Sequence, residues 1–180
     1  MKLIPTLILL AFFIFRYGFT LIKGKRKSGK VARSISLGKK FIEIIIFILM
    51  PALILLELID MQTNTYLYNI GILVSIFGLL LMILTRLNRS TDWGFMGGIP
   101  GNDLFTNGPY RFTRHPYYIG AILVGTGLYL QLNYFFVILI IPVMIFIMYV
   151  IKKEEDFLEK EFGTKYTEYK KKVGIFPWLY

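Results

Sequence analysis

The sequence predicts an all-α integral membrane protein: five transmembrane helices, the fourth and fifth paired as a helical hairpin, then a cytoplasmic C-terminal helix. Of its 180 residues, 56% are hydrophobic and only 18% are charged, and the mean hydropathy is +0.60. A soluble domain of this size could not bury that much apolar surface and still cover its exterior with so few charges. Several apolar runs also reach the roughly 20 residues that a helix needs to cross a hydrocarbon core of about 30 Å.

The first three spans are continuous apolar runs. Leu3–Ile22 could be read as a signal peptide, but its length, the lack of an Ala-x-Ala site after it and the basic cluster that follows it favour a true span. Phe41–Ile59 and Tyr66–Leu87 are the second and third spans.

The fourth and fifth spans come from one apolar region, Tyr117–Ile151, which is too long for a single crossing. It is interrupted at Gln131-Leu132-Asn133, where a tight turn would fold it into two antiparallel helices. The first of these helices carries Gly120, Gly125 and Gly127, small residues that let helix backbones approach closely.

The tail from Lys152 to Lys172 is predicted to form a charged amphipathic helix, because its apolar residues recur at helical spacing.

The charge distribution predicts the orientation. The chain has 21 Lys and Arg against 11 Asp and Glu, and the basic residues gather after the first, third and fifth apolar runs. Five alternating spans put these three segments on one side, which the positive-inside rule makes cytoplasmic. We therefore expect the N-terminus outside, the C-terminus in the cytoplasm and a prokaryotic plasma membrane. The expected partners of the basic residues are membrane lipids, with no nucleic acid.

Missing residues and motifs exclude several classes of site. The chain has no cysteine and one histidine, so we expect no disulfide, no cysteine nucleophile and no transition-metal centre. Soluble-type nucleotide-binding, zinc-protease and serine-hydrolase motifs are also absent from the sequence.

The single histidine, His115, stands directly before Pro116, a favourable first-turn residue for the fourth span. A purely structural role at the helix start is one interpretation. The alternative is a ligand site, because a helix N-terminus offers free N–H groups and a positive dipole end to a carboxylate. Tyr110, Tyr117 and Tyr118 would add π-faces that attract a cation such as a sulfonium, although each alone also fits an interfacial aromatic belt.

A second polar cluster, Glu154-Glu155-Asp156, lies at the exit of the fifth span. A hairpin of the fourth and fifth spans would bring Glu154 close to His115. A solvated acidic helix face is the simpler alternative for this cluster.

Two motifs together resemble the isoprenylcysteine carboxyl methyltransferase family, which is related to phospholipid methyltransferases. They are Asn107-Gly-Pro-Tyr-Arg-x-x-Arg-His-Pro-x-Tyr-x-Gly120 and Glu154-Glu155-x-x-Leu158-x-x-x-Phe162-Gly163-x-x-Tyr166-x-x-Tyr169-x-x-x-Val173-x-x-x-Pro177. The resemblance covers roughly the C-terminal half. It implies a division into three N-terminal transmembrane helices (1–87) and a cofactor-binding catalytic region of loop, hairpin and C-terminal helix (88–180).

The resemblance implies methyl transfer from S-adenosyl-L-methionine to a lipophilic or prenylated substrate. A carboxylate or thiolate acceptor is already nucleophilic and needs no general base, so no residue is assigned as catalytic, and no metal is expected. The cofactor-binding residues it implies are Asn102, Asp103, Leu104, Phe105, Tyr110, His115, Pro116, Tyr117, Tyr118 and Glu154.

One substrate-facing position departs from the family pattern. Carboxyl methyltransferases of the family have an arginine four residues before the first glutamate of the pair, and this chain has Val150 there. An apolar side chain cannot pair with a carboxylate, so a thiol or a phospholipid is an alternative methyl acceptor. A membrane reductase with a nicotinamide cofactor and a non-enzymatic lipid-binding protein remain alternative functions.

Overall fold

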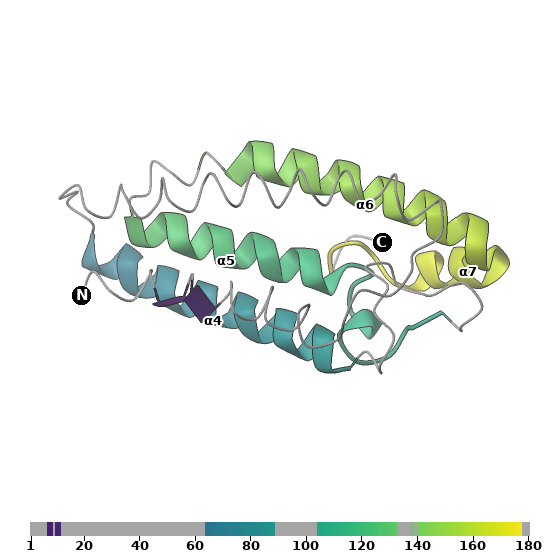
Figure 1. Cartoon of the computed structure of the whole chain (residues 1–180), viewed down its shortest axis with the longest axis horizontal. Coiled ribbons are helices and arrows are strands. Elements are labelled where there is room, and N and C mark those ends of the chain that lie inside the picture. The colour runs from purple at the N-terminus through teal and green to yellow at the C-terminus, as the bar shows by residue number, and fades with distance from the viewer. Residues whose placement is uncertain are drawn as a thin grey trace. The chain divides into compact units, whose positions relative to one another are not determined.

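The computed structural model describes residues 7, 8, 10, 11, 64–88, 104–132, 138 and 140–177. These residues form helices and connecting loops with no strand among them, which confirms the predicted all-α class for this part of the chain. The elements, shown in Figure 1, are α4 (Thr65–Leu87), the short 3-10 helix η2 (Gly108–Arg111), α5 (Pro116–Leu132), α6 (Ile140–Phe162) and α7 (Thr164–Lys172).

The chain divides into two compact units. One comprises Met1–Leu73 and Gly127–Val137, and the other comprises Val74–Thr126 and Ile138–Tyr180. The predicted spans Leu3–Ile22 and Phe41–Ile59 lie outside the described residues, apart from four helical positions at 7, 8, 10 and 11. The five-span count and the division of function at residue 87 therefore stay predictions.

Helix α4 confirms the helix expected for the third predicted span, since it starts one residue before Tyr66 and ends at Leu87. Among the described helices it is the one with the length and apolar composition to cross a membrane. Large apolar side chains such as Leu73 and Phe77 are more than 60% exposed. Such a surface suits contact with lipid chains.

The long apolar region contains two helices, as predicted, but Gln131 and Leu132 of the predicted turn belong to α5, and Asn133 lies outside the described residues. Helix α5 continues through Gln131 and Leu132, and the Gln131 side chain donates a 3.0 Å hydrogen bond to the carbonyl oxygen of Gly127 one turn earlier. The side-chain amide thus bonds to its own helix there. Pro142 lies in the first turn of α6, where a missing backbone N–H costs little.

Glycines let α4 and α5 approach closely. In the first unit, a Cβ on Gly71 would lie 2.5 Å from the carbonyl oxygen of Gly127. In the second unit, a Cβ on Gly78 would lie 2.7 Å from the carbonyl oxygen of Gly120. The predicted role of Gly120 and Gly127 is confirmed, whereas Gly125 faces Ile140 of α6 instead.

The charged tail is not one helix, and this prediction was wrong. Helix α6 runs past the apolar segment to Phe162, and α7 begins only after Gly163 (Figure 1). Gly163 has φ +53° and ψ −124°, a backbone conformation that side chains other than hydrogen strongly disfavour. The chain therefore bends at Gly163, and the buried residues of α7 pack back on α6 in a cluster of Leu158, Tyr166, Tyr169 and Val173, against which Leu104, Phe157 and Phe162 pack.

Candidate active site

The start of α5 follows the prediction. Pro116 is its first residue, and the carbonyl oxygen of His115 accepts hydrogen bonds from the backbone N–H groups of Tyr118 and Ile119 at 3.1 and 3.2 Å. His115 is 4% exposed. The histidine is thus held at a buried helix N-terminus.

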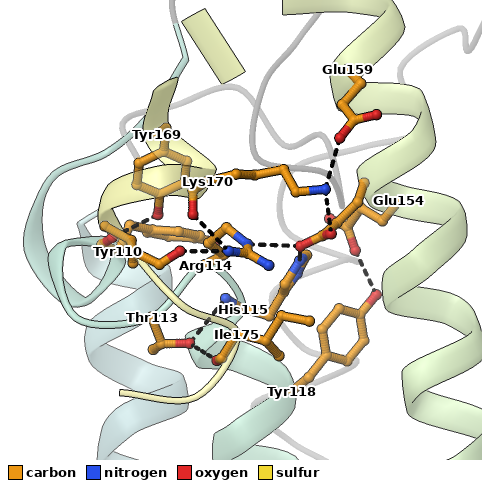
Figure 2. Close-up of polar contacts among 12 residues, drawn as sticks. Tyr110, Thr113, Arg114, His115, Tyr118, Glu154, Glu159, Tyr169, Lys170 and Ile175 are labelled. Carbon is orange, nitrogen blue, oxygen red and sulfur yellow. Dashed lines mark hydrogen bonds and ion pairs between the residues drawn. The ribbon is translucent and has the colours of Figure 1, made fainter. Parts of the chain in front are cut away.

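The Glu155 carboxylate contacts three basic side chains, Arg114, His115 and Lys170, which are labelled in Figure 2. Its Oε1 is 2.8 Å from Nε of Arg114 and 3.3 Å from Nε2 of His115, and its Oε2 is 3.2 Å from Nζ of Lys170. An ionised carboxylate only accepts hydrogen bonds, so Nε2 of His115 carries the proton in this pair. Glu155 therefore ties the start of α5 to α7.

Burial alone would raise the pKa of Glu155, but the hydrogen bond from His115 and the charge of Arg114 lower it from 4.5 to about 2. The hydrogen bond to Glu159, 2.7 Å from Nζ, is the main cause that raises the pKa of Lys170, and contact with Glu155 adds to it. Both groups are charged at neutral pH, and the ion pairs are present throughout the physiological range.

Arg114 also binds the backbone at the end of α7 and just after it. Its Nη1 donates to the carbonyl oxygens of Lys170 and Val173 at 3.3 and 2.5 Å, and its backbone N–H donates to the carbonyl oxygen of Gly174 at 3.0 Å. The Arg114 guanidinium thus binds groups of the protein itself.

Two further hydrogen bonds attach the loop before α5 to the C-terminal region. The Thr113 hydroxyl donates to the carbonyl oxygen of Ile175 and accepts from the backbone N–H of His115 at 3.2 Å. The Tyr169 hydroxyl donates to the carbonyl oxygen of Tyr110 at 2.6 Å. The loop, α5 and α7 are therefore mutually fixed.

Glu154 faces a different partner from its neighbour. Its Oε2 accepts a 2.9 Å hydrogen bond from the Tyr118 hydroxyl, and both side chains are buried. The expected approach of α5 and α6 is present, but the direct partner of His115 is Glu155 rather than Glu154. Successive residues point about 100° apart on a helix, so only one of the two carboxylates can face the histidine.

Aromatic rings surround these polar groups. Phe105 and Tyr110 make an edge-on contact with centroids 5.6 Å apart. Tyr118 lies 5.8 Å from His115 and 6.2 Å from Tyr117 by centroid distance. The rings offer faces that could bind a cation.

The predicted cofactor-binding residues in the described part of the chain are linked by contacts. Leu104 packs on the α6–α7 cluster, whose Tyr169 bonds to Tyr110, and Tyr118 joins His115 to Glu154. Asn102 and Asp103 lie outside the described residues. Val150 is buried on α6 one turn before Glu154.

The site also contains residues that the sequence interpretation had not assigned: Thr113, Arg114, Glu155, Tyr169 and Lys170. Arg114, Glu155 and Tyr169 are fixed positions of the two quoted motifs, and this was the sequence pattern that could have indicated them. No such pattern indicated Thr113 or Lys170, because their contacts depend on how α7 folds back.

Comparison with known families supports the interpretation of the motifs. The family model described as phospholipid methyltransferase matches residues 66–165. This range covers α4, η2, α5 and α6 and ends at the start of α7. No curated protein and no solved structure gives a significant match.

Proposed function

The chain belongs to the phospholipid methyltransferase family, and on this basis we propose that it transfers a methyl group from S-adenosyl-L-methionine to a lipophilic acceptor. Membership of this family, together with an apolar helix long enough to cross a bilayer, makes it a membrane methyltransferase. The cofactor and the acceptor are the parts that we propose.

The observation that carries the proposal is the buried hydrogen-bonded pair of Tyr118 on α5 and Glu154 on α6. Tyr118 donates to Glu154 inside a site lined by aromatic rings. A carboxylate has about four acceptor positions, so Glu154 can accept from Tyr118 and from a hydroxyl or amino group of the cofactor together. The faces of Tyr110, Tyr117 and Tyr118 suit a sulfonium. The residues present therefore fit this cofactor.

When bound, the cofactor would supply a methyl group on a positively charged sulfur. That methyl group would pass to a lone pair of the acceptor, and the sulfur would keep the electrons of the broken bond in the product S-adenosyl-L-homocysteine. The chain's own residues would hold the two reactants in line and exclude water, and positioning of this kind can lower a barrier by about 7–11 kcal/mol. His115, which is bonded to Glu155, fixes the geometry of the site rather than moving a proton.

The residue at position 150 bears on the acceptor. Val150 is apolar and buried, and Lys152 is exposed on another side of α6. Arg114 is engaged by Glu155 and by carbonyl oxygens of the chain. These three observations favour a thiol or a phospholipid headgroup over a prenylcysteine carboxylate. An amine acceptor would need one further step, because it would have to lose a proton.

We further propose five spans, with the N-terminus outside and the C-terminus and active site in the cytoplasm of a prokaryotic cell. The chain has no cysteine, so single cysteines can be labelled cleanly. A cysteine in place of Lys171 should react with an impermeant maleimide only after the membrane is permeabilised, and one in place of Gln62 should react in intact cells. The reverse pattern would overturn the orientation.

Cofactor choice can be tested by calorimetry on the full chain in detergent. S-adenosyl-L-homocysteine should bind, and His115→Ala should weaken that binding, whereas Lys160→Ala at an exposed position of α6 should not. Binding of NADPH with no binding of S-adenosyl-L-homocysteine would replace this proposal with a reductase. Transfer of labelled methyl to thiol, phospholipid and prenylcysteine acceptors then identifies the substrate.

A further inference from the structure

Tyr166 of α7 is among the most enclosed side chains of the described residues, with 1% of its surface exposed. Its ring packs in the cluster formed by Leu158, Tyr169 and Val173. Its hydroxyl, however, makes no hydrogen bond within the part of the chain that the structure describes. Tyr169, in the same cluster, differs because its hydroxyl is bonded to Tyr110.

A buried hydroxyl without a partner disfavours the folded state, because it has given up water and gained nothing. Phenylalanine would fill the same space and make the same ring contacts. The described part of the fold therefore gives no reason for an oxygen atom at this position, and a bound ligand could supply one.

The Tyr166 ring lies beside the candidate active site, because Nζ of Lys170 is 5.9 Å from the centre of the ring and 3.2 Å from Oε2 of Glu155. Burial is the main cause that raises the pKa of Tyr166 far above the usual value; Glu155 and Glu154 raise it further, and Arg114 opposes them. The hydroxyl thus keeps its proton and is a hydrogen-bond donor at any physiological pH. Leu104, one of the residues that we expect to bind cofactor, packs on the same cluster.

The surrounding charges restrict the ligand atom. Two carboxylates, Glu154 and Glu155, and two positive groups, Arg114 and Lys170, surround this side chain; Nζ of Lys170 is 5.9 Å from the centre of the ring. Both positive groups already pair with Glu155, so they would offset little of the repulsion between the two glutamates and a ligand carboxylate. A neutral acceptor, such as a ring nitrogen of adenine or an oxygen of ribose, meets no such repulsion.

We propose that Tyr166 is a further cofactor-binding residue, whose hydroxyl donates a hydrogen bond to a neutral acceptor on the nucleoside part of S-adenosyl-L-methionine. The inference rests on the proposed function, since it requires that cofactor. It adds a polar contact from α7 to those from α5 and α6, so that the nucleoside would be held from three helices.

The test is Tyr166→Phe in the full chain, with Tyr169→Phe as the matched control. Tyr166→Phe should weaken S-adenosyl-L-homocysteine binding about three- to tenfold, the effect of one lost hydrogen bond. The thermal midpoint of the ligand-free protein should stay the same or rise. Tyr169→Phe removes the same atom from a formed hydrogen bond and should lower that midpoint.

Three outcomes decide the proposal. Unchanged S-adenosyl-L-homocysteine affinity in Tyr166→Phe would overturn it, as would a loss of ligand-free stability as large as that of Tyr169→Phe. Competition with 5′-methylthioadenosine, which lacks the amino-acid part, should show the same weakening; a normal affinity there would overturn the assignment to the nucleoside. If the unmodified protein binds no S-adenosyl-L-homocysteine, the proposed function itself is wrong, and this result is distinct from a failure that concerns Tyr166 alone.

Discussion

Arg114 and Glu155 form an ion pair with 2.8 Å between Nε and Oε1, across 41 positions of the chain, and each side chain is 10% exposed. The same guanidinium binds two backbone carbonyl oxygens at the end of α7. One side chain therefore joins the loop before α5, the C-terminal half of α6 and the backbone at the end of α7. The geometry of the candidate site depends on this junction.

Glu155→Gln should destabilise the protein strongly, because it leaves the Arg114 side chain, which is only 10% exposed, without its charge partner. Loss of one member of a buried pair costs about 3–5 kcal/mol, measured as a shift in unfolding in detergent. Glu159→Gln is the control: Glu159 also contacts Lys170 but is 43% exposed, so its loss should cost less than about 1 kcal/mol. Equal effects of the two changes would contradict this account of Glu155.

Stability should fall in acid through the protonation of Glu155. Its pKa in the folded protein is about 2, below the ordinary 4.5, so the unfolded chain takes up the proton first as pH falls. The contribution of Glu155 is therefore complete above about pH 4.5 and is lost towards pH 2. Unfolding measured from pH 6 to pH 2 should show this loss, and Glu155→Gln should flatten the profile over that window.

Gly120→Ala should weaken the contact between α4 and α5. The new Cβ would lie 2.5 Å from Cγ of Met82 and 2.8 Å from the carbonyl oxygen of Gly78, and the backbone cannot yield as a side chain can. We expect a loss of about 1–3 kcal/mol. Gly125→Ala meets only the end of the Ile140 side chain, at 3.1 Å, and should be neutral or stabilising. The comparison requires only thermal unfolding of the two variants.

Gly163→Ala should strain the bend between α6 and α7. Nothing lies within 4 Å of the added Cβ, so the whole effect comes from φ +53° and ψ −124°, at a cost of about 1–3 kcal/mol. Thr164→Ala, at the exposed neighbouring position, should change stability by less than about 0.5 kcal/mol. If Gly163→Ala unfolded like the unmodified chain, backbone strain at this bend would be ruled out.

The sequence was sufficient to predict a structural feature where a single residue or a short run determines that feature. Pro116 predicted the start of α5, and the apolar run from Tyr66 predicted α4 almost to the residue. Gly120 and Gly127 were expected at close helix contacts and lie at them. These features follow from steric and hydrophobic preferences of single positions or short runs.

The partner of His115 could not be predicted in the same way. Glu154 and Glu155 are chemically alike and adjacent, and the rotation of α6 about its own axis decides which one meets the histidine. That rotation is set by packing along the whole helix. The bend at Gly163 was missed because the apolar spacing from Phe157 to Tyr169 is compatible with one helix, and a single glycine inside such a pattern is often tolerated.

The contact between Gly78 and Gly120 has a consequence for where the chemistry takes place. Gly120 is five residues from His115, about 7 Å along the helix axis, so this contact fixes the level of the histidine against α4. Since α4 has the length and composition to cross a bilayer, two hydrogen atoms in place of side chains would set the height of the histidine relative to any membrane that α4 crosses.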